Sequence, residues 1–477
     1  MPIKRYYADK DTTITNAYKE DLQTRGTGSN MGLSDSLETF TIYNQVNYSI
    51  SGSTVTTGSQ TEAARILIKF DASTIKSDYD AATVPSGSSF YLRLFNAKHP
   101  FTLPKNYNLE VYPITKSWDE GFGLDMENYS DETVANWMFA STGDAWTVSG
   151  AMSDVDTLLG TASFSYGDED IILDITNHVY GWRDDSSTHK GLLITFPTSS
   201  LSETRSYYTK KFFARDTQYF YKKPAIEARW DDSISDDRGR VYKISNRLSD
   251  SDNTNNLYLY NWYNGTLQNI AGTPTMTIKL YSDSARTVEL SGSTYTGSAG
   301  LGVVTTSSTG IFTVPARIDT DATTIYTKWY SGSTTYHEDS LAVSARPFKN
   351  DYNEPEYIIS MPNLKSSYTT DEATRLRLYT RLKDWSPTIY TVASKKIENQ
   401  IVTKAYYRVI RLVDDIEVIN YGTGSVSYTQ LSYDVSGSYF DLDMSLFESG
   451  YAYGIKYIFK INGKYREQPE IFKFRVD

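Results

Sequence analysis

The sequence contains no cysteine and few histidines among its 477 residues. Without cysteine, neither a disulfide nor a thiolate metal site can stabilise the chain. The four histidines are His99, His178, His189 and His337, and no two of them have the i, i+4 spacing of a metal-binding pair on a helix. Gly-rich phosphate loops and the Gly-x-Ser-x-Gly motif of serine hydrolases are also absent. We therefore predict no cofactor, no metal site, no catalytic residue and no enzymatic activity.

Positive charge and long apolar runs are scarce as well. The chain has 47 basic and 58 acidic residues, a net charge of −11, which argues against nucleic acid as a partner. No run of about 18 apolar residues is present, so we expect no membrane contact. Residues 1–7 lack the apolar core of a signal peptide. We expect the chain to be made in a cytoplasm without a signal peptide.

Aromatic residues are abundant, with 40 Tyr, 19 Phe and 8 Trp. Many of the tyrosines occupy alternate positions in short runs rich in Thr, Val and Ile, a pattern typical of β-strands. The tripeptide Ser-Gly-Ser recurs, starting at residues 51, 86, 291, 331 and 436, and it predicts turns because Gly tolerates positive φ. The sequence thus predicts an all-β fold of tandem β-sandwiches. Short helical segments are expected near residues 131–137 and 174–182.

Two polar segments divide the chain. Residues 231–240 are acidic and rich in turn formers, and residues 345–355 contain two prolines that bracket polar side chains. We predict three domains, at residues 1–232, 233–347 and 348–477. Alternation at period two predicts strands in the second domain at 276–280, 311–314 and 325–330, and in the third at 375–381, 407–412 and 455–461. Both are expected to be Ig-like sandwiches.

The first domain contains an ordered set of segments with a recognisable spacing. They lie at residues 7–14, 64–71, 90–95, 109–120, 173–182, 211–216 and 223–230. Their order and spacing resemble the DNRLRE domain, a jelly-roll-like β-sandwich related to carbohydrate-binding modules. The resemblance implies a binding or building module without a catalytic group. It also implies that Trp118, Trp182, Phe212 and Phe213 are core residues rather than platforms for sugars.

Paired carboxylates offer the nearest approach to catalytic chemistry. Asp119 and Glu120 follow Trp118, and Asp125 and Glu127 lie close by, as the acid and base of a glycosidase would require. We interpret them as turn and structural residues, because acidic residues after this Trp have a structural place in the resembled family.

A second polar segment is loosely similar to a calcium loop. Oxygen-bearing side chains alternate at Asp250, Asp252, Thr254 and Asn256, but the Gly at the sixth position and the Glu at the twelfth are missing. We interpret this segment as an ordinary connection between strands. A structural calcium ion stays open only by analogy with carbohydrate-binding sandwiches.

The third domain carries arginines that alternate with its apolar residues. They are Arg375, Arg377, Arg381, Arg408 and Arg411. We predict that this charged face is solvated or meets an acidic neighbour.

Two functions remain from different classes. Tandem sandwiches, abundant Tyr, no Cys and loops rich in Ser, Gly and Thr resemble structural proteins of marine tailed bacteriophages. We therefore predict a structural virion protein of the neck, tail or capsid surface, whose partners are other virion proteins and copies of itself. The alternative is a glycan-binding protein that contacts a host-surface or extracellular polysaccharide, as the carbohydrate-binding-module relationship suggests. The sequence identifies no particular binding residues for either function.

Overall fold

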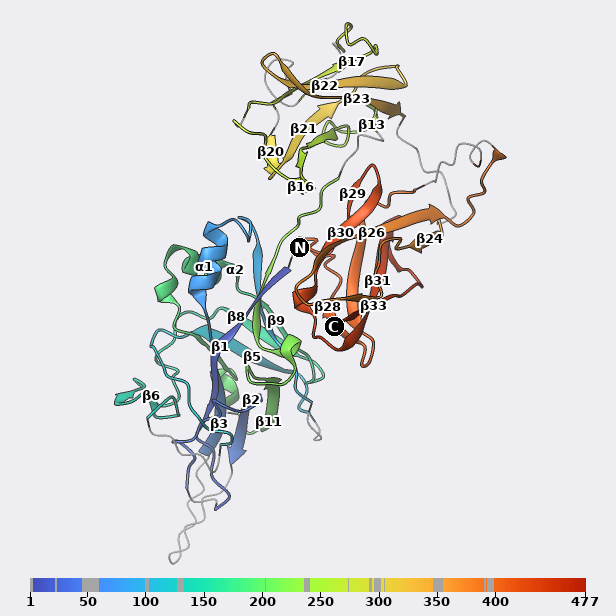
Figure 1. Ribbon diagram of the computed structural model, residues 1–477. Helices are drawn as coiled ribbons and strands as arrows, with labels where there is room; N and C mark the ends of the chain where they lie inside the picture. The colour runs from blue at the N-terminus through green and yellow to red at the C-terminus, as the bar shows by residue number, and fades with distance from the viewer. Residues whose placement is uncertain are drawn as a thin grey trace, which may run out of the picture.

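The computed structural model describes most of the chain. The described residues are 3–21, 24–44, 60–98, 103–126, 133–201, 203–235, 241–272, 274–290, 294–295, 302–303, 305–345, 355–389, 392 and 399–477. Strands dominate among them and group into three sets of sheets (Figure 1), which we call the N-terminal, central and C-terminal units. Each unit encloses a core of its own between packed sheets. The predicted all-β class of tandem β-sandwiches is confirmed.

The N-terminal unit is built on one continuous strand that belongs to two sheets. Its strands are β1 (Ile3–Thr15), β2 (Ser36–Asn44), β3 (Gln60–Phe70), β4 (Ser89–Leu94), β5 (Tyr107–Pro113), β6 (Phe139–Ser141), β7 (Asp144–Ala145), β8 (Gly160–Phe164), β9 (Ile171–Asp174), β10 (Leu192–Thr195), β11 (Tyr207–Phe213) and β12 (Ala225–Arg229). The strand order is β8-β5-β10-β3-β1-β12-β4-β9, and β2 joins β3 to β11. The first half of β1 pairs with β12 and the second half with β3, with a register shift between Ala8 and Lys10. This irregularity lets β1 turn from one sheet into the other.

Both faces of the sheet around β3 are buried. On one face, Ile66 and Ile68 pack toward the opposite sheet with Leu92 and Ile226. On the other face, Leu67 contacts an irregular segment that supplies three tryptophans. These are Trp118, Trp137 and Trp146. Consecutive residues of a strand point to opposite faces, so the apolar run from Ile66 to Ile68 reflects burial on two sides.

The helices of the N-terminal unit agree only in part with the sequence prediction. They are α1 (Ala72–Asp80), α2 (Thr176–Asp184) and α3 (Thr198–Leu201), with 3-10 turns η1 (Ser186–Thr188) and η2 (Phe220–Lys222). Helix α2 confirms the segment expected at 174–182. The helix expected at 131–137 is wrong for residues 133–137, which form bends and turns, while 131 and 132 lie outside the described residues. Helix α1 was not expected; the Asp71 carboxylate starts it by accepting from the backbone N–H groups of Ser73 and Thr74.

The central unit is a small sandwich closed around Trp329. Its strands are β13 (Val241–Tyr242), β14 (Asn255–Tyr260), β15 (Trp262–Tyr263), β16 (Thr266–Leu267), β17 (Thr277–Tyr281), β18 (Thr294–Tyr295), β19 (Gly302–Val303), β20 (Thr305–Ser308), β21 (Ile311–Arg317), β22 (Thr324–Ser331) and β23 (Thr334–Ser344). One sheet has the order β13-β23-β22-β17-β19, and the other has β14-β21-β18 with β20 on β21. Strands β17, β21 and β22 confirm the three runs predicted from period-two alternation.

The C-terminal unit repeats this design with a larger aromatic core. Its strands are β24 (Tyr357–Ser360), β25 (Ser367–Tyr368), β26 (Ala373–Leu382), β27 (Ala405–Arg411), β28 (Ile416–Ile419), β29 (Ser432–Asp434), β30 (Gly437–Asp443), β31 (Tyr451–Ile461), β32 (Lys464–Glu467) and β33 (Phe472–Val476), with the 3-10 turn η3 (Met444–Leu446). The sheets have the orders β24-β26-β30-β29 and β25-β33-β31-β27-β28. Strands β26, β27 and β31 confirm the predicted runs. In both units an early strand runs parallel to the last strand, β13 to β23 and β25 to β33.

Three of the Ser-Gly-Ser sequences form the turns that were predicted. Gly332 lies in the turn between β22 and β23 with φ of 58°, and Gly437 is the first residue of β30, directly after the turn from β29, with φ of 118°. Gly87 precedes β4 with φ of 89°. These backbone conformations favour Gly over residues with a Cβ atom. The sequences at 51–53 and 291–293 lie outside the described residues.

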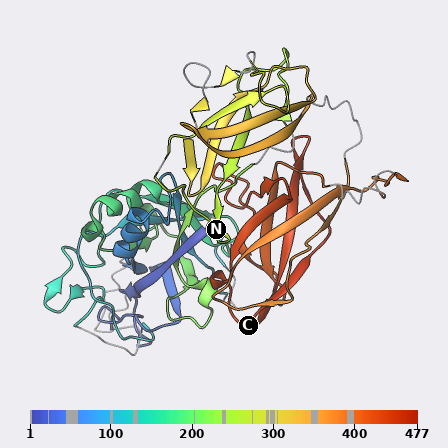
Figure 2. The same ribbon diagram turned by 45° about the horizontal axis from the view of Figure 1, so that its top comes forward.

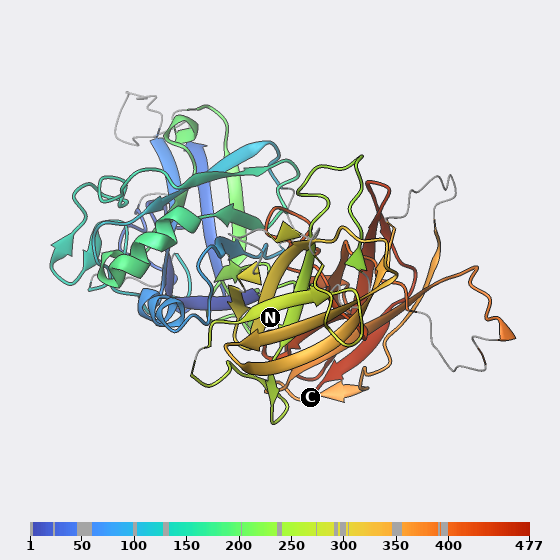
Figure 3. The same cartoon turned by 90° about the horizontal axis from the view of Figure 1, so that it is seen from above.

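The N-terminal and C-terminal units lie side by side although the central unit separates them in the sequence. Figures 1, 2 and 3 show the two units adjacent, and Figures 1 and 2 show the central unit at one end of the molecule. Ile3, at the start of β1, is 6% exposed and belongs to the core of the C-terminal unit. The connection that leaves β12 also binds this unit, because Ile234 N–H donates to Ser432 Oγ (3.0 Å) and Tyr433 N–H donates to Ile234 O (2.9 Å).

Candidate functional site

The carboxylates considered for catalysis have structural partners. Glu120 forms a bidentate ion pair with Arg215, whose Nη2 and Nε lie 2.8 and 3.1 Å from its oxygens. Glu120 also accepts from Asp11 N–H at 2.7 Å, and Asp11 accepts from Arg215 N–H at the same distance. Burial raises the pKa of Asp11 to about 7. Burial also raises the pKa of Glu120 above its ordinary value. Because Asp11 is 1% exposed, a substrate cannot reach it.

The other acidic candidates lie at the surface or outside the described part of the chain. Asp119 has an exposed side chain 3.6 Å from Lys10 Nζ, and Asp125 is half-buried. Glu127 falls outside the described residues.

Two of the four histidines pack against one tryptophan. The ring centre of His189 lies 3.9 Å from that of Trp182, and the ring centre of His178 lies 5.2 Å from that of Trp182. His189 Nε2 accepts from Phe70 N–H at 3.2 Å, and burial lowers the pKa of His189 to about 3. A neutral, buried imidazole of this kind is a structural residue. His337 lies 3.7 Å from Asp339 at the surface of the central unit, and His99 falls outside the described residues.

The segment compared with a calcium loop is an ordinary polar turn. Asp250 pairs with Arg317 at 2.5 Å, and Asp252 accepts from Ser249 Oγ at 2.6 Å. Thr254 Oγ1 donates to the backbone oxygen of Asp250, and Asn256 is exposed. Among the described residues, no group of three or more His, Cys, Asp or Glu side chains could hold a metal ion. The described residues also contain no helix long and apolar enough to span a membrane.

The aromatic residues predicted to be core residues divide into two groups. Trp118, Trp182 and Phe212 are at most 3% exposed and lie in the cores of the N-terminal unit, which confirms the prediction for them. For Phe213 the prediction is wrong. Its side chain is half-buried on the opposite face of β11 and packs edge-on against Tyr219 at 5.5 Å. Adjacent strand residues point to opposite faces, so Phe212 and Phe213 cannot both enter one core.

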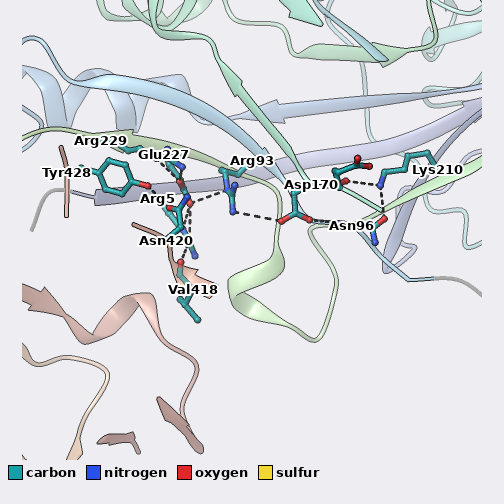
Figure 4. Close-up of polar contacts among 11 residues, drawn as sticks. Arg5, Arg93, Asn96, Asp170, Lys210, Glu227, Arg229, Val418, Asn420 and Tyr428 are labelled. Atoms are coloured by element: carbon teal, nitrogen blue, oxygen red, sulfur yellow. Dashed lines mark hydrogen bonds and ion pairs between the residues drawn. The ribbon is translucent and has the colours of Figure 1, made fainter. Parts of the chain in front are cut away.

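Charged side chains gather where the N-terminal unit meets the C-terminal unit. At the centre lies Glu227 of β12, whose side chain is 4% exposed. Arg5 of β1 binds it at 2.8 Å, Arg229 binds it through Nε at 2.9 Å, and Arg93 of β4 lies 3.6 Å away (Figure 4). Burial by itself would raise the pKa of Glu227, but the three guanidinium charges outweigh burial and lower it to about 2. We call these four residues the arginine–glutamate cluster.

The arginine–glutamate cluster also holds the C-terminal unit. Arg5 Nη2 donates to the backbone oxygen of Val418 at 2.9 Å. The guanidinium of Arg229 lies 4.7 Å from the ring centre of Tyr428, whose hydroxyl donates to Asn420. These contacts place side chains of β1 and β12 directly against the C-terminal sandwich.

A second contact joins the same two units. Arg411, one of the predicted surface arginines, is 4% exposed and stacks 4.6 Å from the ring centre of Tyr221 in the N-terminal unit. It also pairs with Asp414 and Glu448. Arg411 is therefore buried rather than solvated, and its acidic partners belong to its own unit. A contact of this face with an acidic neighbouring protein stays a prediction.

The remaining arginines of that set differ in their partners. Arg375 pairs with Asp441 at 2.8 Å, Arg377 with Asp434 at 2.9 Å and Arg408 with Glu417 at 2.5 Å. Arg381 is half-buried near Trp385, with its guanidinium 6.0 Å from the ring centre. The charged face is therefore partly covered by acidic side chains of the same unit.

A polar chain extends from the cluster into the N-terminal unit. Arg93 Nη2 lies 4.0 Å from Asp170 Oδ2, and Asp170 accepts from Asn96 N–H at 2.8 Å. The Asn96 side chain in turn accepts from Lys210 Nζ at 2.7 Å (Figure 4). Lys210 is 1% exposed and donates to two further backbone oxygens, of Gly167 and Glu169. Burial lowers the pKa of Lys210 to about 8. This lysine fixes the loop that carries Asp170.

Beside this chain a cleft of about 950 Å³ opens between the two units. Its wall in the N-terminal unit includes Arg93, Asp168, Asp170 and Lys222, while Glu417 is among the residues that the C-terminal unit contributes. Because both units supply walls, the cleft exists only while they are docked. It is the candidate functional site.

Sequence reasoning did not identify this site. Glu227 and Arg229 stand in the otherwise apolar strand Ala225–Arg229, and Arg93 stands in the apolar strand Ser89–Leu94. Charged residues inside such strands are a signal of buried ion pairs. The partners on the C-terminal unit, however, lie far away in the sequence; Arg5 and its partner Val418 are 413 residues apart.

Comparisons with known proteins assign no family. No family model matches the chain, and no curated protein matches it. Among solved structures, a chimeric titin Z1Z2 is 13% identical, with a TM-score of 0.16, and the match covers 52% of this chain and 95% of that one. The Escherichia coli adhesin FdeC is 11% identical, with a TM-score of 0.16, covering 61% and 79%. The Yersinia pseudotuberculosis adhesin InvE is 14% identical, with a TM-score of 0.15, covering 48% and 61%. Scores this low carry no argument about function.

Proposed function

We propose that the chain is a non-enzymatic structural protein of a tailed bacteriophage virion, at the neck, tail or capsid surface. It assembles through contacts with other virion proteins and with copies of itself. The observation that carries the proposal is the joint between the N-terminal and C-terminal units. Ile3 of the first strand is buried in the core of the last sandwich, and Arg5 two residues later is fixed by Glu227 and Val418.

Such a joint favours a structural role because it resembles a permanent interface. Contacts between domains that move are usually polar and solvated, whereas permanent interfaces bury apolar side chains as a core does. Two sandwiches held in one orientation present their loops and strand edges in a constant arrangement. A subunit of a symmetric ring or array needs this property, because every copy must offer the same surface to its neighbour.

The surface also offers side chains suited to protein contacts. Several aromatic residues of loops, short hairpins and strand β11 are more than half exposed: Phe122 (67%), Tyr166 (69%), Tyr208 (62%), Trp262 (52%) and Tyr263 (62%). Tyr and Trp are enriched at interfaces because they combine apolar area with a polar atom at a small entropy cost. These residues are the contacts that we expect assembly to cover.

The test is the composition of the particle. Particles of the phage that encodes this chain are purified and analysed by quantitative mass spectrometry and cryo-electron microscopy. We expect the chain at a copy number set by the particle's symmetry, with residues such as Tyr166 or Tyr263 at subunit contacts. Absence from the particle, or presence without contact to any neck, tail or capsid subunit, would contradict the proposal.

A further inference from the structure

The interior of the N-terminal unit contains a lysine amine in direct contact with a side-chain carboxamide. Lys210 of β11 is 1% exposed, and its Nζ atom lies 2.7 Å from Asn96 Oδ1 (Figure 4). Because a C=O bond is about 1.23 Å long, Nζ lies within about 4 Å of the carbonyl carbon Cγ of Asn96. Attack of an amine on a carbonyl carbon starts from a separation of about 3–3.5 Å. The two groups are therefore close to the distance at which they can react.

The backbone holds both side chains in this position. Asn96 forms an isolated antiparallel bridge with Phe212, so Lys210 is its diagonal neighbour on the same face. Asn96 N–H donates to Asp170 Oδ1 at 2.8 Å, which fixes the residue that carries the carboxamide. Lys210 Nζ also donates to two backbone oxygens of the neighbouring loop, at 2.8 and 3.0 Å. Reacting groups that the fold already orients lose little entropy on the way to the transition state.

The surroundings of Lys210 favour the neutral amine. Its Nζ atom lies 4.8 Å from the ring centre of Phe164 and 4.9 Å from that of Phe212, and both rings are at most 1% exposed. Burial in this apolar environment lowers the pKa of Lys210 to about 8, although the acidic side chains of residues 168–170 act in the opposite direction. A neutral amine has the free electron pair that a nucleophile needs.

We propose that Lys210 and Asn96 react with each other to form an intramolecular isopeptide bond. The neutral amine of Lys210 attacks Asn96 Cγ, the Nζ–Cγ bond forms, and the Cγ–Nδ2 bond breaks. One proton of the amine passes to Nδ2, which leaves as ammonia, so the reaction needs no oxidant and no other co-reactant. Asn96 lines the cleft between the N-terminal and C-terminal units, and this cleft gives the ammonia a path to solvent.

The isopeptide bond ties the two sheets of the N-terminal unit to each other. Asn96 lies two residues after β4, which pairs with β12, whereas β11 pairs with β2 in the sheet around β3. The chain has no cysteine, so a side-chain amide takes the place that a disulfide has in other proteins. The linked residues are 114 positions apart, and a cross-link over so long a loop stabilises the fold by restricting the unfolded chain. This inference does not depend on the place of the chain in a virion.

Mass spectrometry of the full chain tests the proposal. The folded protein is incubated at about pH 8, where a large fraction of Lys210 is neutral, and is then denatured and weighed. We expect an intact mass that is lower than that of the unlinked chain by one ammonia molecule. After proteolysis we expect a branched peptide in which an amide joins Asn96 to Lys210. An intact mass equal to that of the unlinked chain, or a loss of ammonia without the branched peptide, would overturn the proposal.

Two variants each remove one reacting group. Lys210→Met and Asn96→Ala should each abolish the loss of ammonia and the branched peptide, and Asn96→Ala should also lower the midpoint of thermal unfolding. Lys211→Gln is the matched control, because Lys211 points to the opposite face of β11 and pairs with Glu38, and the variant should keep the bond. Asn96 is only half-buried, so Asn96→Ala keeps the test valid if Lys210→Met fails to fold. A loss of ammonia that persists in either variant would overturn the proposal.

Discussion

The C-terminal unit touches its two neighbours in contrasting ways. Toward the N-terminal unit it buries Ile3 at 6% exposure and receives hydrogen bonds and ring contacts from Arg5 and Arg229. Toward the central unit, Trp262 is 52% exposed and lies 6.0 Å from the guanidinium of Arg375. A small cavity of about 200 Å³ also lies between Leu267 and Ile311 of the central unit and side chains of the C-terminal unit.

This difference shows that sequence order and physical association do not coincide. The units that are farthest apart in the sequence share a buried interface, while the unit between them makes the looser contact. We therefore expect the N-terminal and C-terminal units to unfold together and the central unit to unfold as a separate cooperative body.

The largest expected effect comes from the centre of the joint. Glu227→Gln leaves three buried guanidinium groups without their shared carboxylate, and removing one partner of a buried ion pair costs about 3–5 kcal/mol. We expect a loss near the upper end of that range in the transition of the joined units, measured by urea unfolding with circular dichroism. The control Glu289→Gln removes a partly exposed partner of Lys279 and should change stability by at most about 1 kcal/mol. A loss as small as the control's would contradict the role given to Glu227.

A core substitution in the central unit should shift the unfolding transition of that unit and leave the transition of the joined units unchanged. Trp329 is 1% exposed, and Trp329→Ala should destabilise by about 4 kcal/mol in the transition of the central unit alone. The matched variant Trp182→Ala, at an equally buried position of the N-terminal unit, should lower stability by about 3–5 kcal/mol in the transition of the joined units. Tryptophan fluorescence and hydrogen exchange distinguish the two transitions. If both variants shift one common transition, the central unit is not independent.

Acid should weaken the joint through Glu227. The folded pKa of Glu227 is about 2, below its ordinary value of 4.5. The contribution of Glu227 to the free energy of unfolding is therefore fully present above pH 4.5 and is lost as the pH falls through 2. At about 1.4 kcal/mol per pKa unit, the loss is about 3 kcal/mol. The stability gap between the wild type and Glu227→Gln should therefore narrow from pH 7 to pH 2.5 in urea titrations. A gap that is constant over this range would contradict the assignment.

The smallest effect is expected at the contact of the central unit. Trp262→Ala removes a half-exposed ring whose cation–π contact with Arg375 is long, so stability should change by less than about 1 kcal/mol. Ile3→Ala, at the joint between the N-terminal and C-terminal units, should lower the free energy of unfolding by about 2 kcal/mol or more, because the Ile3 side chain lies in a packed core. Equal effects in urea unfolding would remove the distinction between the two contacts.

The sequence predicted the strands well because their signal is local. Alternation at period two identified β17, β21, β22, β26, β27 and β31. Helix α1 was missed because its N-cap Asp71 follows an apolar strand directly. The segment that contains Trp137 was predicted to be helical, but its residues 133–137 form bends and turns.

The joint could not be predicted for a physical reason. Arg93 and Arg229 stand in apolar strands, which signals that they are buried in ion pairs, but this signal does not show which unit covers them. Their face is buried by a unit that the chain forms more than 100 residues later, and no local pattern records that contact. The same limit applies to Phe213, whose exposure depends on how the two units form the cleft.

Hydrogen exchange of the whole chain, followed by mass spectrometry in increasing urea, tests the central claim most directly. We predict that peptides from β12 and β28 lose protection together, at a urea concentration different from that of β22. Opening of β12 and β28 in separate transitions would show that the N-terminal and C-terminal units are not one body.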